Sequence, residues 1–519
     1  MARLTAVCVV VVSGLHVAAL PVVAQPASDA KPAQSAGATS TPPAATRMSL
    51  GECISFALKN NRRREVARDG IGIAESQITQ ARSAYWPELS LQAKAMHLDE
   101  DPNFIFPSST IPVPASTIPV PSQRVTIPAN AFAPGLPPAN VPLNTPASTV
   151  NVPAQSFTIP KQTVKVMDRD NAVGTVNLMF PIYTGGLRSA KLAQAKAGLE
   201  AARQEARRAD LEIVYDVKRA YYAAVLCGQL VEIAEDSLVR MAVTLELTER
   251  LYKTGSGRVK KTDYLRHHAS VESLRSIASA LKDKDRAARA GLVIAMGMPW
   301  DTPIDPSEKE IPFSPQDAAV DSLVDAAHRN NADLGRMKAA LAAAGEEVKA
   351  AKSGHHPKAA ILGSAGKILN SYDAGIVSPE NRNFWSVGVG VEVSVFDGFR
   401  TRARVAEARM RQHKLEMEER LLRDRIALEV EQLASQARRC QEQEKSSREA
   451  MQSAIENRDL TIRAYQDELM ETKDVIEAQL LAAFLIGQYR TVLYEGAESR
   501  SKLDFLLGDE ARQGFERDE

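Results

Sequence analysis

The chain has few aromatic residues and no net charge. Phe, Trp and Tyr make up 5% of its 519 residues, which is low for a compact enzyme core, and 64 Lys and Arg residues balance 64 Asp and Glu residues. A neutral chain produces no whole-chain field of the kind that attracts nucleic acid. Ala, Leu, Glu, Arg and Lys dominate long stretches instead, which favours extended helices over a globule.

Cysteine is also scarce, with four residues. Cys8 lies in a segment that we expect to be removed, so Cys53, Cys227 and Cys440 remain, an odd number without any C-x-x-C spacing. This pattern excludes a disulfide framework. Cys227 and Cys440 occupy matching positions in two repeats of the sequence, so we expect them to lie apart as free thiols.

Recognisable catalytic patterns are missing as well. The adjacent pairs His267-His268 and His355-His356 would point away from each other on a helix and do not suit a shared metal ion. The sequence shows no nucleophile–base arrangement and no phosphate-binding loop. We therefore expect no catalytic, cofactor or metal site, and a protein that is not an enzyme.

A single long apolar run occurs, at Leu4–Leu20, preceded by Arg3 and ended by Pro21. This pattern predicts a signal peptide over residues 1–24 and hence an exported protein. A membrane anchor is the alternative, but the run is shorter than the ~20 residues that span a bilayer. Residues 25–47 are rich in Pro, Ala, Ser and Thr, which predicts a disordered leader.

The sequence contains an internal duplication. Asn60-Asn61 and Pro87 correspond to Asn330-Asn331 and Pro357, and the segment IYTGGLRSAKLAQAKA corresponds to VFDGFRTRARVAEARM. Matches that recur in the same order predict two tandem repeats. We place the first repeat, a linker, the second repeat and a C-terminal tail at residues 48–299, 300–315, 316–508 and 509–519.

Alternating residues predict four strands, two in each repeat. They lie near residues 88–94, 175–182, 358–361 and 387–395, where apolar residues alternate with polar or small ones. A soluble sheet with one face on a core is the alternative, but an exported chain with such strands favours a membrane barrel. The residues expected to face lipid in the last strand are Val387, Val389, Val391, Val393 and Val395.

Four strands are too few to close a barrel in the outer membrane, and open edges are not tolerated in lipid. Several chains must therefore share one barrel. Each repeat also predicts a helix before its first strand, over about 48–86 and 316–354, and two very long helices after its second strand. Thr184 and Asp397 are suitable N-caps for the first long helices, and residues 186–252 alone would span ~100 Å.

This arrangement resembles the TolC family of outer-membrane efflux proteins over residues 48–510. The motifs that carry the resemblance are the Asn-Asn pairs, the Pro junctions, the strand-to-helix turns PIYTGG and VFDG, and the helix ends Leu292–Gly297 and Leu503–Gly508. The resemblance implies a mainly α fold with a membrane β-barrel. Three chains would form a 12-stranded barrel on a periplasmic α-helical tunnel.

The function that the resemblance implies is a passive exit duct in the outer membrane, serving a tripartite efflux or type I secretion system. Its partners would be a periplasmic adaptor, an inner-membrane transporter and outer-membrane lipid, with no nucleic acid. Two alternatives are a periplasmic coiled-coil adaptor or structural protein, and an exported hydrolase on a helical scaffold. The transported substrate is not predicted.

The resemblance also suggests functional residues. Asp474 and Glu477 would ring the periplasmic aperture, and the i, i+3 spacing places them on one helix face. An ordinary solvated helix face is the alternative. The candidates for a tip lock or adaptor contact are Tyr252, Asp263 and Tyr465, and Tyr465 is expected to be able to pair with Asp263.

Two positions depart from the family pattern near the tip. Glu468 stands where a glycine is usual and Leu469 where an arginine is common, so we expect a weaker or different lock. At the other end of the long helices, the glycines expected at the strand-to-helix turns are Gly185, Gly186 and Gly398.

The proline-rich segment 99–169 makes the first repeat longer by roughly sixty residues. Its repeated Ser-Thr-Ile-Pro-Val-Pro favours an extended or polyproline II chain, because each proline lacks an N–H and fixes φ. Outer-membrane barrels keep long loops outside the cell, so we expect a surface loop. It would be either a disordered spacer or an ordered cap, packed through Ile111, Ile118, Ile127 and Phe132.

Overall fold

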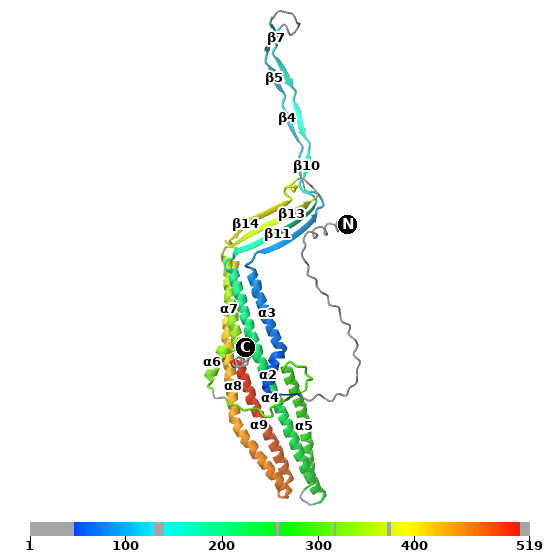
Figure 1. The fold of residues 1–519 in the computed structure, drawn as a ribbon, viewed down its shortest axis with the longest axis vertical. Helices are drawn as coiled ribbons and strands as arrows, with labels where there is room; N and C mark the ends of the chain where they lie inside the picture. The colour runs from blue at the N-terminus through cyan, green and yellow to red at the C-terminus, as the bar shows by residue number, and fades with distance from the viewer. Residues whose placement is uncertain (1–45, 129–139, 256–258, 316–317, 371–374, 509–519) are drawn as a thin grey trace, which may run out of the picture. The chain divides into compact units, whose positions relative to one another are not determined.

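Residues 46–128, 140–255, 259–315, 318–370 and 375–508 are described by the computed structural model. The expected signal peptide, most of the leader, the C-terminal tail and Phe132 lie outside these residues. From Arg47 onward the chain forms one unit. Long helices lie at one end of a four-stranded sheet in this unit, and a narrow β-ribbon continues from the other end (Figure 1).

The same order of elements occurs twice. The elements of the first half are β1 (Thr46–Met48), α2 (Leu50–Asn60), α3 (Arg62–Ser83), β2 (Glu88–His97), the ribbon strands, β11 (Asp170–Tyr183), α4 (Leu187–Lys253) and α5 (Lys261–Ala295). Those of the second half are β12 (Ile304–Pro306), α6 (Val320–Asn330), α7 (Ala332–Lys352), a short 3-10 turn (Ser353–His355), β13 (Lys358–Asn370), β14 (Asn383–Glu392), α8 (Arg400–Gln466) and α9 (Thr472–Leu507).

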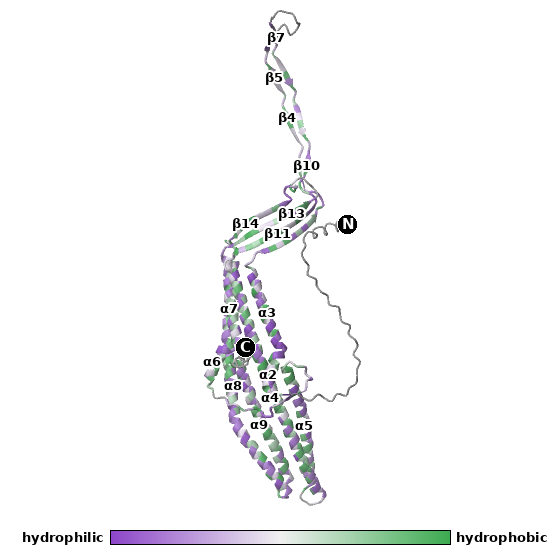
Figure 2. Cartoon of the chain, in the orientation of Figure 1, coloured by the Kyte–Doolittle hydropathy of each residue, from purple (hydrophilic) through white to green (hydrophobic). Residues whose placement is uncertain are grey.

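The helices α4 and α8 have 67 residues each, which corresponds to ~100 Å. Hydrophilic and hydrophobic residues are interspersed along them (Figure 2). Among the described residues, no helix combines the length and the apolar character that crossing a bilayer requires.

The first helix of each half is broken in two, so the expectation of continuous helices over 48–86 and 316–354 is wrong. Asn61 and Asn331 stand at the breaks with extended backbone, φ −73° and −61° respectively. Each side chain caps the following helix: Asn61 Oδ1 accepts the N–H of Arg63 and Asn331 Oδ1 that of Asp333, both at 2.9 Å. A capped break of this kind is favourable because it satisfies helix N–H groups that otherwise lack partners.

The same two asparagines also hold the end of the last helix of their own repeat. Asn61 Nδ2 donates to the carbonyl of Ala295 at 2.9 Å, and Asn331 Nδ2 donates to that of Leu506 at 3.1 Å. The helices end in the left-handed glycines Gly297 (φ +79°) and Gly508 (φ +67°). A Cβ on Gly297 would lie 3.0 Å from Asn61 Cα, so glycine permits both the turn and the close approach.

Two apolar clusters with equivalent positions pack around these junctions. In the first half, Tyr221, Val217 and Cys53 are fully buried against the end of α5. In the second half, Val430 and Leu334 belong to the corresponding cluster among α6, α7, α8 and α9.

The three cysteines in the described part of the chain, Cys53, Cys227 and Cys440, are free thiols. Burial raises the pKa of Cys53 to about 11. Its thiol therefore remains protonated at neutral pH and behaves as a small apolar side chain.

The four expected strands are present and form one antiparallel sheet in the order β14-β13-β11-β2. The central pair β11–β13 joins the two halves of the chain, in one register from Asn171 opposite Asn370 to Pro181 opposite Ala360, and after a bulge Tyr183 lies opposite Ala359. Among the described strands, β2 and β14 pair on one side only. The sheet is therefore open at both edges.

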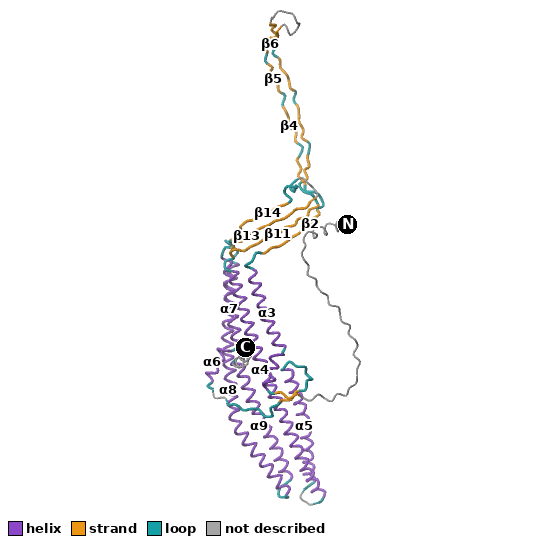
Figure 3. Tube along the Cα trace, viewed as in Figure 1, coloured by secondary structure: helices purple, strands orange, loops and turns teal. Residues whose placement is uncertain are grey.

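The described part of the insert forms a paired ribbon, which we call the proline ribbon (residues 103–128 and 140–165). Its strands pair antiparallel as four successive units, β3·β10, β4·β9, β5·β8 and β6·β7, separated by short breaks (Figure 3). Their bounds are β3 (Asn103–Phe106), β4 (Ser109–Val113), β5 (Ser116–Val120), β6 (Gln123–Pro128), β7 (Asn140–Thr145), β8 (Ser148–Val152), β9 (Gln155–Ile159) and β10 (Gln162–Lys165). The extended chain was predicted correctly; the described part is neither a polyproline II segment nor a disordered spacer.

Prolines explain the breaks in the ribbon. Both strands carry a proline at each break. The breaks in the first strand start at Pro107, Pro114 and Pro121, and the breaks opposite them start, in the same order, at Pro160, Pro153 and Pro146. A proline without an N–H interrupts the ladder at these points. Prolines within strands, such as Pro112 and Pro119, are tolerated because a two-stranded ribbon leaves alternate N–H groups unpaired at its outer edges.

We expect Asn61→Ala and Asn331→Ala each to lower stability by about 1–2 kcal/mol, because each loses a helix cap and a tie to a helix end. Thermal unfolding of the detergent-solubilised protein measures this loss. Asn60→Ala is the matched control, since the exposed Asn60 amide bonds only to the carbonyl of Phe56 in its own helix. Equal effects at Asn60 and Asn61 would contradict the proposed role.

Candidate functional site

The four-stranded sheet has one strongly apolar face. Cross-strand register places Leu89, Leu178, Gly363 and Val387 in one row and Leu91, Val176, Ala365 and Trp385 in the next. The side chains at the two edges are exposed to 70% or more, with Leu89 at 70%, Leu91 at 73%, Val387 at 70% and Trp385 at 80%. An apolar face of this extent requires a covering layer or an apolar solvent.

The opposite face of the same sheet is mainly polar or small, with Met179 and Leu362 among its exceptions. One row consists of Ser90, Asn177, Ser364 and Ser386, and the hydroxyls of Ser364 and Ser386 are 2.8 Å apart. A sheet with one apolar and one polar face suits a wall between hydrocarbon and water.

The valines predicted to face lipid divide into two groups. Val387, Val389 and Val391 lie in β14 and are 68–70% exposed. Val393 and Val395 were wrongly placed in the strand, because β14 ends at Glu392. The ladder stops there because Glu392 pairs with Lys358, the first residue of β13, and the preceding Pro357 has no N–H to continue it.

The predicted glycines lie at the strand-to-helix turns. Gly185, Gly186 and Gly398 all have positive φ, and the non-glycine Phe399 shares this conformation at φ 64°. A Cβ on Gly185 would lie 2.8 Å from the carbonyl oxygen of Ser353. Glycine is therefore required here both for the turn and for the contact between the two repeats.

Thr184 and Asp397 act near the helix starts, although α4 and α8 begin a few residues later than predicted. Thr184 Oγ1 accepts the N–H of Arg188 at 3.3 Å, and Asp397 Oδ2 accepts that of Thr401 at 2.9 Å. Arg188 also donates to the carbonyls of Pro181 and Ile182, at 2.7 and 2.6 Å. The Arg188 guanidinium group thus supplies hydrogen-bond donors to backbone carbonyls near the end of β11, where strand pairing stops.

The far ends of the long helices carry the remaining predicted residues. Asp263 and Asp474 occupy the same position in α5 and α9, where each carboxylate accepts the backbone N–H of the N-cap residue, Lys260 at 3.1 Å and Glu471 at 3.4 Å. Both are therefore helix caps. Tyr252 is 37% exposed and its ring stacks on that of Tyr264 at a centroid distance of 5.9 Å.

Tyr465 does not pair with Asp263 in this structure. The Tyr465 side chain is buried, and its hydroxyl lies 2.8 Å from that of Thr248 and 3.1 Å from that of Thr472. Thr248 belongs to α4, so this hydroxyl contact joins the first helical hairpin to the second. Contacts of this kind hold the two hairpins together near their tips.

A buried histidine extends this network; from the sequence, His267 was considered only as a metal ligand together with His268. His267 is fully buried; its Nδ1 lies 3.0 Å from Thr248 Oγ1 and its Nε2 lies 3.3 Å from Thr244 Oγ1. Gln479 of α9 donates to the same Thr244 hydroxyl at 3.3 Å. The available signal was that His267 continues the 3–4 spacing of the apolar residues Val271 and Leu274 in α5, because such positions face a packed helix.

The two aperture candidates differ in exposure. Asp474 is half-buried as a helix cap, whereas Glu477 is 65% exposed and lies 3.6 Å from the Lys473 ammonium group. Such an exposed i, i+4 pair contributes little. Both residues lie in α9, three positions apart.

Acid should weaken the network around His267, because burial lowers the pKa of this imidazole from 6.5 to about 4. The unfolded chain then binds a proton that the folded chain excludes, so stability is complete above pH ~6.5 and falls as the pH approaches ~4. At pH ~5 the loss is on the order of 2 kcal/mol per chain. His267→Gln should flatten this part of the stability curve, measured as apparent unfolding temperature at pH ~7.5 and ~5.

The matched control for this experiment is His268→Gln, which removes the exposed neighbouring imidazole. It should retain the acid sensitivity of the parent protein. Parallel curves for the parent and His267→Gln would show that another group is responsible.

The chain is similar in sequence to one protein family and to two characterised proteins. The family model described as outer membrane efflux protein matches residues 155–298 and 323–508. The outer membrane efflux protein BepC of Brucella suis is 22% identical over 320 residues, which cover 59% of this chain and 67% of BepC. The protein CyaE of Bordetella pertussis is 26% identical over 242 residues, which cover 46% of this chain and 50% of CyaE.

Solved structures show the same fold. A membrane protein from Pseudomonas aeruginosa superimposes with a TM-score of 0.65 at 17% identity, over 91% of this chain and 99% of that one. The outer membrane protein VceC of Vibrio cholerae does so with a TM-score of 0.65 at 16% identity, over 88% of this chain and 96% of VceC. These matches confirm the resemblance seen in the sequence, and the chain belongs to the outer membrane efflux protein family.

Proposed function

We propose that three copies of this chain form a passive exit duct through the outer membrane, as part of a tripartite efflux or type I secretion system. The family assigns the chain to outer-membrane efflux. The observation that carries the finer proposal is the four-stranded sheet, which is apolar on one face, polar on the other and open at both edges.

Physical chemistry requires partners for the edge strands β2 and β14 in a membrane. Unpaired N–H and C=O groups cost several kcal/mol each in hydrocarbon, so a spanning sheet must close on itself. A barrel needs at least eight strands, which one chain does not supply. Three chains would supply twelve strands, the number implied by the resemblance to the TolC family.

The helices would continue the duct into the periplasm. They leave the same end of the sheet (Figure 1), and α4 and α8 reach ~100 Å from it. Their polar residues suit a water-filled tunnel. The amphipathic sheet argues against a periplasmic coiled-coil adaptor, which has no need for a lipid-facing surface.

Partners would act at the opposite, periplasmic tip. A periplasmic adaptor and an inner-membrane transporter would supply the substrate and its driving force, since a passive duct has none of its own. Tyr252, Asp263 and Tyr465 remain our candidates for the tip lock or adaptor contact. The Tyr465–Thr248 bond supports a lock within one chain, since opening the tip by separating its two hairpins would break it.

We further propose that Asp474 and Glu477 narrow and charge the tunnel mouth. Three copies would place six carboxylates in two stacked rings, and converging charges of one sign focus the potential in a channel. Lys473 reduces this field through its pair with Glu477, but the pair is exposed and weak.

The trimer is tested by mass. We expect the purified protein in detergent to have the native mass of three chains, to dissociate on heating, and to form ion-conducting channels in planar bilayers. Closure of the sheet by copies of the chain is the physical reason. A stable monomer, or an oligomer with an even number of chains, would contradict the proposal.

The charged aperture is tested by conductance. Asp474→Asn with Glu477→Gln should reduce cation selectivity and weaken block by multivalent cations, because the focused negative potential is removed. The matched control is Glu449→Gln with Glu456→Gln, which removes two exposed carboxylates from α8 instead. If both double variants keep the selectivity and block of the parent, Asp474 and Glu477 belong to an ordinary solvated face.

A further inference from the structure

The proline ribbon carries a repeated apolar pair on one face. At the centre of three successive units, Ile111 faces Phe157, Ile118 faces Val150, and Val125 faces Leu143. These six side chains are 47–66% exposed. An apolar pair that recurs at a fixed spacing of seven residues indicates that each unit meets the same kind of surface.

The other face of each unit is polar apart from one proline, Pro112, Pro119 or Pro142. The residues next to the apolar pairs are Thr110 opposite Thr158, Thr117 opposite Asn151, and Arg124 opposite Asn144. Alternation of this kind in a strand is typical of one covered face and one face in water. In this chain, the described residues provide no layer that covers the apolar pairs.

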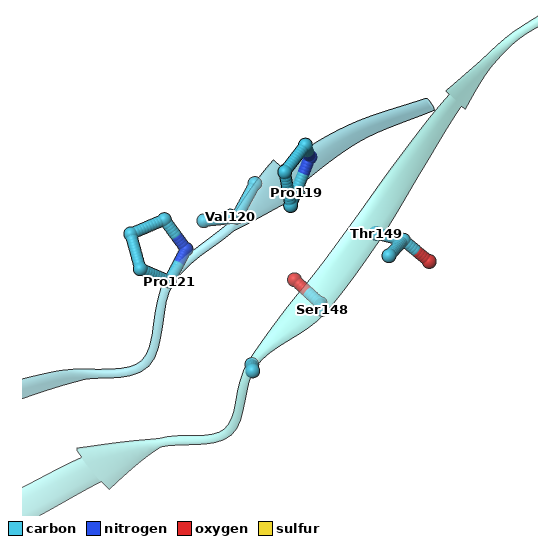
Figure 4. A pocket seen from close by; sticks show the side chains of 6 residues that line it. Pro119, Val120, Pro121, Ser148 and Thr149 are labelled. Atoms are coloured by element: carbon cyan, nitrogen blue, oxygen red, sulfur yellow. The ribbon is translucent and has the colours of Figure 1, made fainter. Parts of the chain in front are cut away.

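A two-stranded ribbon alone is marginally stable in water and usually requires a further layer. The breaks interrupt the pairing of the two strands and so increase the need for a further layer. At the break next to β5 and β8, a hollow is lined by Pro119, Val120, Pro121, Ala147, Ser148 and Thr149. Figure 4 shows this hollow between the two strands where they stop pairing.

The edges of the ribbon do not suit the addition of another strand. Pro112 and Pro119 remove edge N–H groups within β4 and β5, and the prolines at the breaks limit every free edge to about five residues. A partner is therefore expected to pack on the apolar face and not to extend the ladder.

The charge distribution of the ribbon favours a second copy of the ribbon as the partner. From Asn103 to Lys165 the sequence has no Asp or Glu, and its three cations are Arg124, Lys161 and Lys165. Arg124 lies on the polar face, and Lys165 at the ribbon base is 3.0 Å from Asp101. The apolar face thus packs on a copy of itself without burying a charge, whereas three dispersed cations form no cluster for an anionic lipid surface.

We propose that the apolar faces of three ribbons, one from each copy of this chain, pack together into a stalk beyond the barrel. This inference rests on the proposed trimer. The ribbon continues directly from β2 and β11 (Figure 1), so a shared barrel would hold the three ribbon bases on one rim. Because the three ribbons would be tethered to one rim, the effective concentration of each apolar face near the other two would be high. Weak individual contacts between the faces would then be sufficient to hold the ribbons together.

The test uses single cysteines in the full-length trimer, in a background in which all native cysteines are replaced by alanine. Packed β-layers lie about 10 Å apart, so a bismaleimide of about that span should link Ile118→Cys between chains. One reagent joins two thiols, and the expected product on a denaturing gel is a covalent dimer that includes up to two of every three chains. Thr117→Cys, one residue away on the polar face, should give several-fold less dimer.

Ile111→Cys and Thr110→Cys repeat the comparison in the neighbouring unit, so that a defect of one variant does not decide the result. Native mass is measured for each protein before cross-linking. Absence of dimer at Ile118→Cys and Ile111→Cys in an intact trimer, or equal dimer on both faces, overturns the stalk while the duct stands. A monomeric cysteine-free parent overturns the duct, and the stalk with it.

Discussion

The ladder between β11 and β13 holds the two halves of the chain together. It pairs residues almost two hundred positions apart in sequence, and it places the strand-to-helix turn of the first repeat beside the helix-to-strand junction of the second. Gly185 lies so close to Ser353 at this junction that a side chain would collide with the backbone. From this fixed base, α4 runs beside α7 and α9 along the bundle, and the directions of all the long helices follow.

Polar hydrogen bonds hold the helices together at two further places along the bundle. Asn61 and Asn331 join each broken first helix to the end of the returning helix, and the network around Thr248 joins the two hairpins near their tips. These bonds are buried, so each broken one leaves a polar group without its partner in a medium of low dielectric constant. Directional bonds of this kind fix the register of long helices, which apolar stripes alone would allow to slide.

The proline ribbon shows how a residue that breaks ladders is accommodated within one. Within the described strands, each proline lies either at a break shared by both strands or at a position whose N–H would point outward. The result is a series of short paired units that resist edge-to-edge association and leave one apolar face uncovered. The seven-residue period of the sequence is thus the period of the ribbon.

The sequence by itself determined the local elements. Alternating residues predicted the four strands, long stretches of helix-forming residues predicted the long helices, and the duplicated motifs predicted the repeats, because composition, periodicity and turn residues act over a few neighbouring positions. Tertiary structure decided what depends on a distant partner. Val393 lies outside β14 because the ladder stops at Lys358, and Tyr465 bonds to Thr248 because another helix supplies that hydroxyl. The pairing of the ribbon likewise depends on the register of two strands up to about sixty residues apart, which no local pattern specifies.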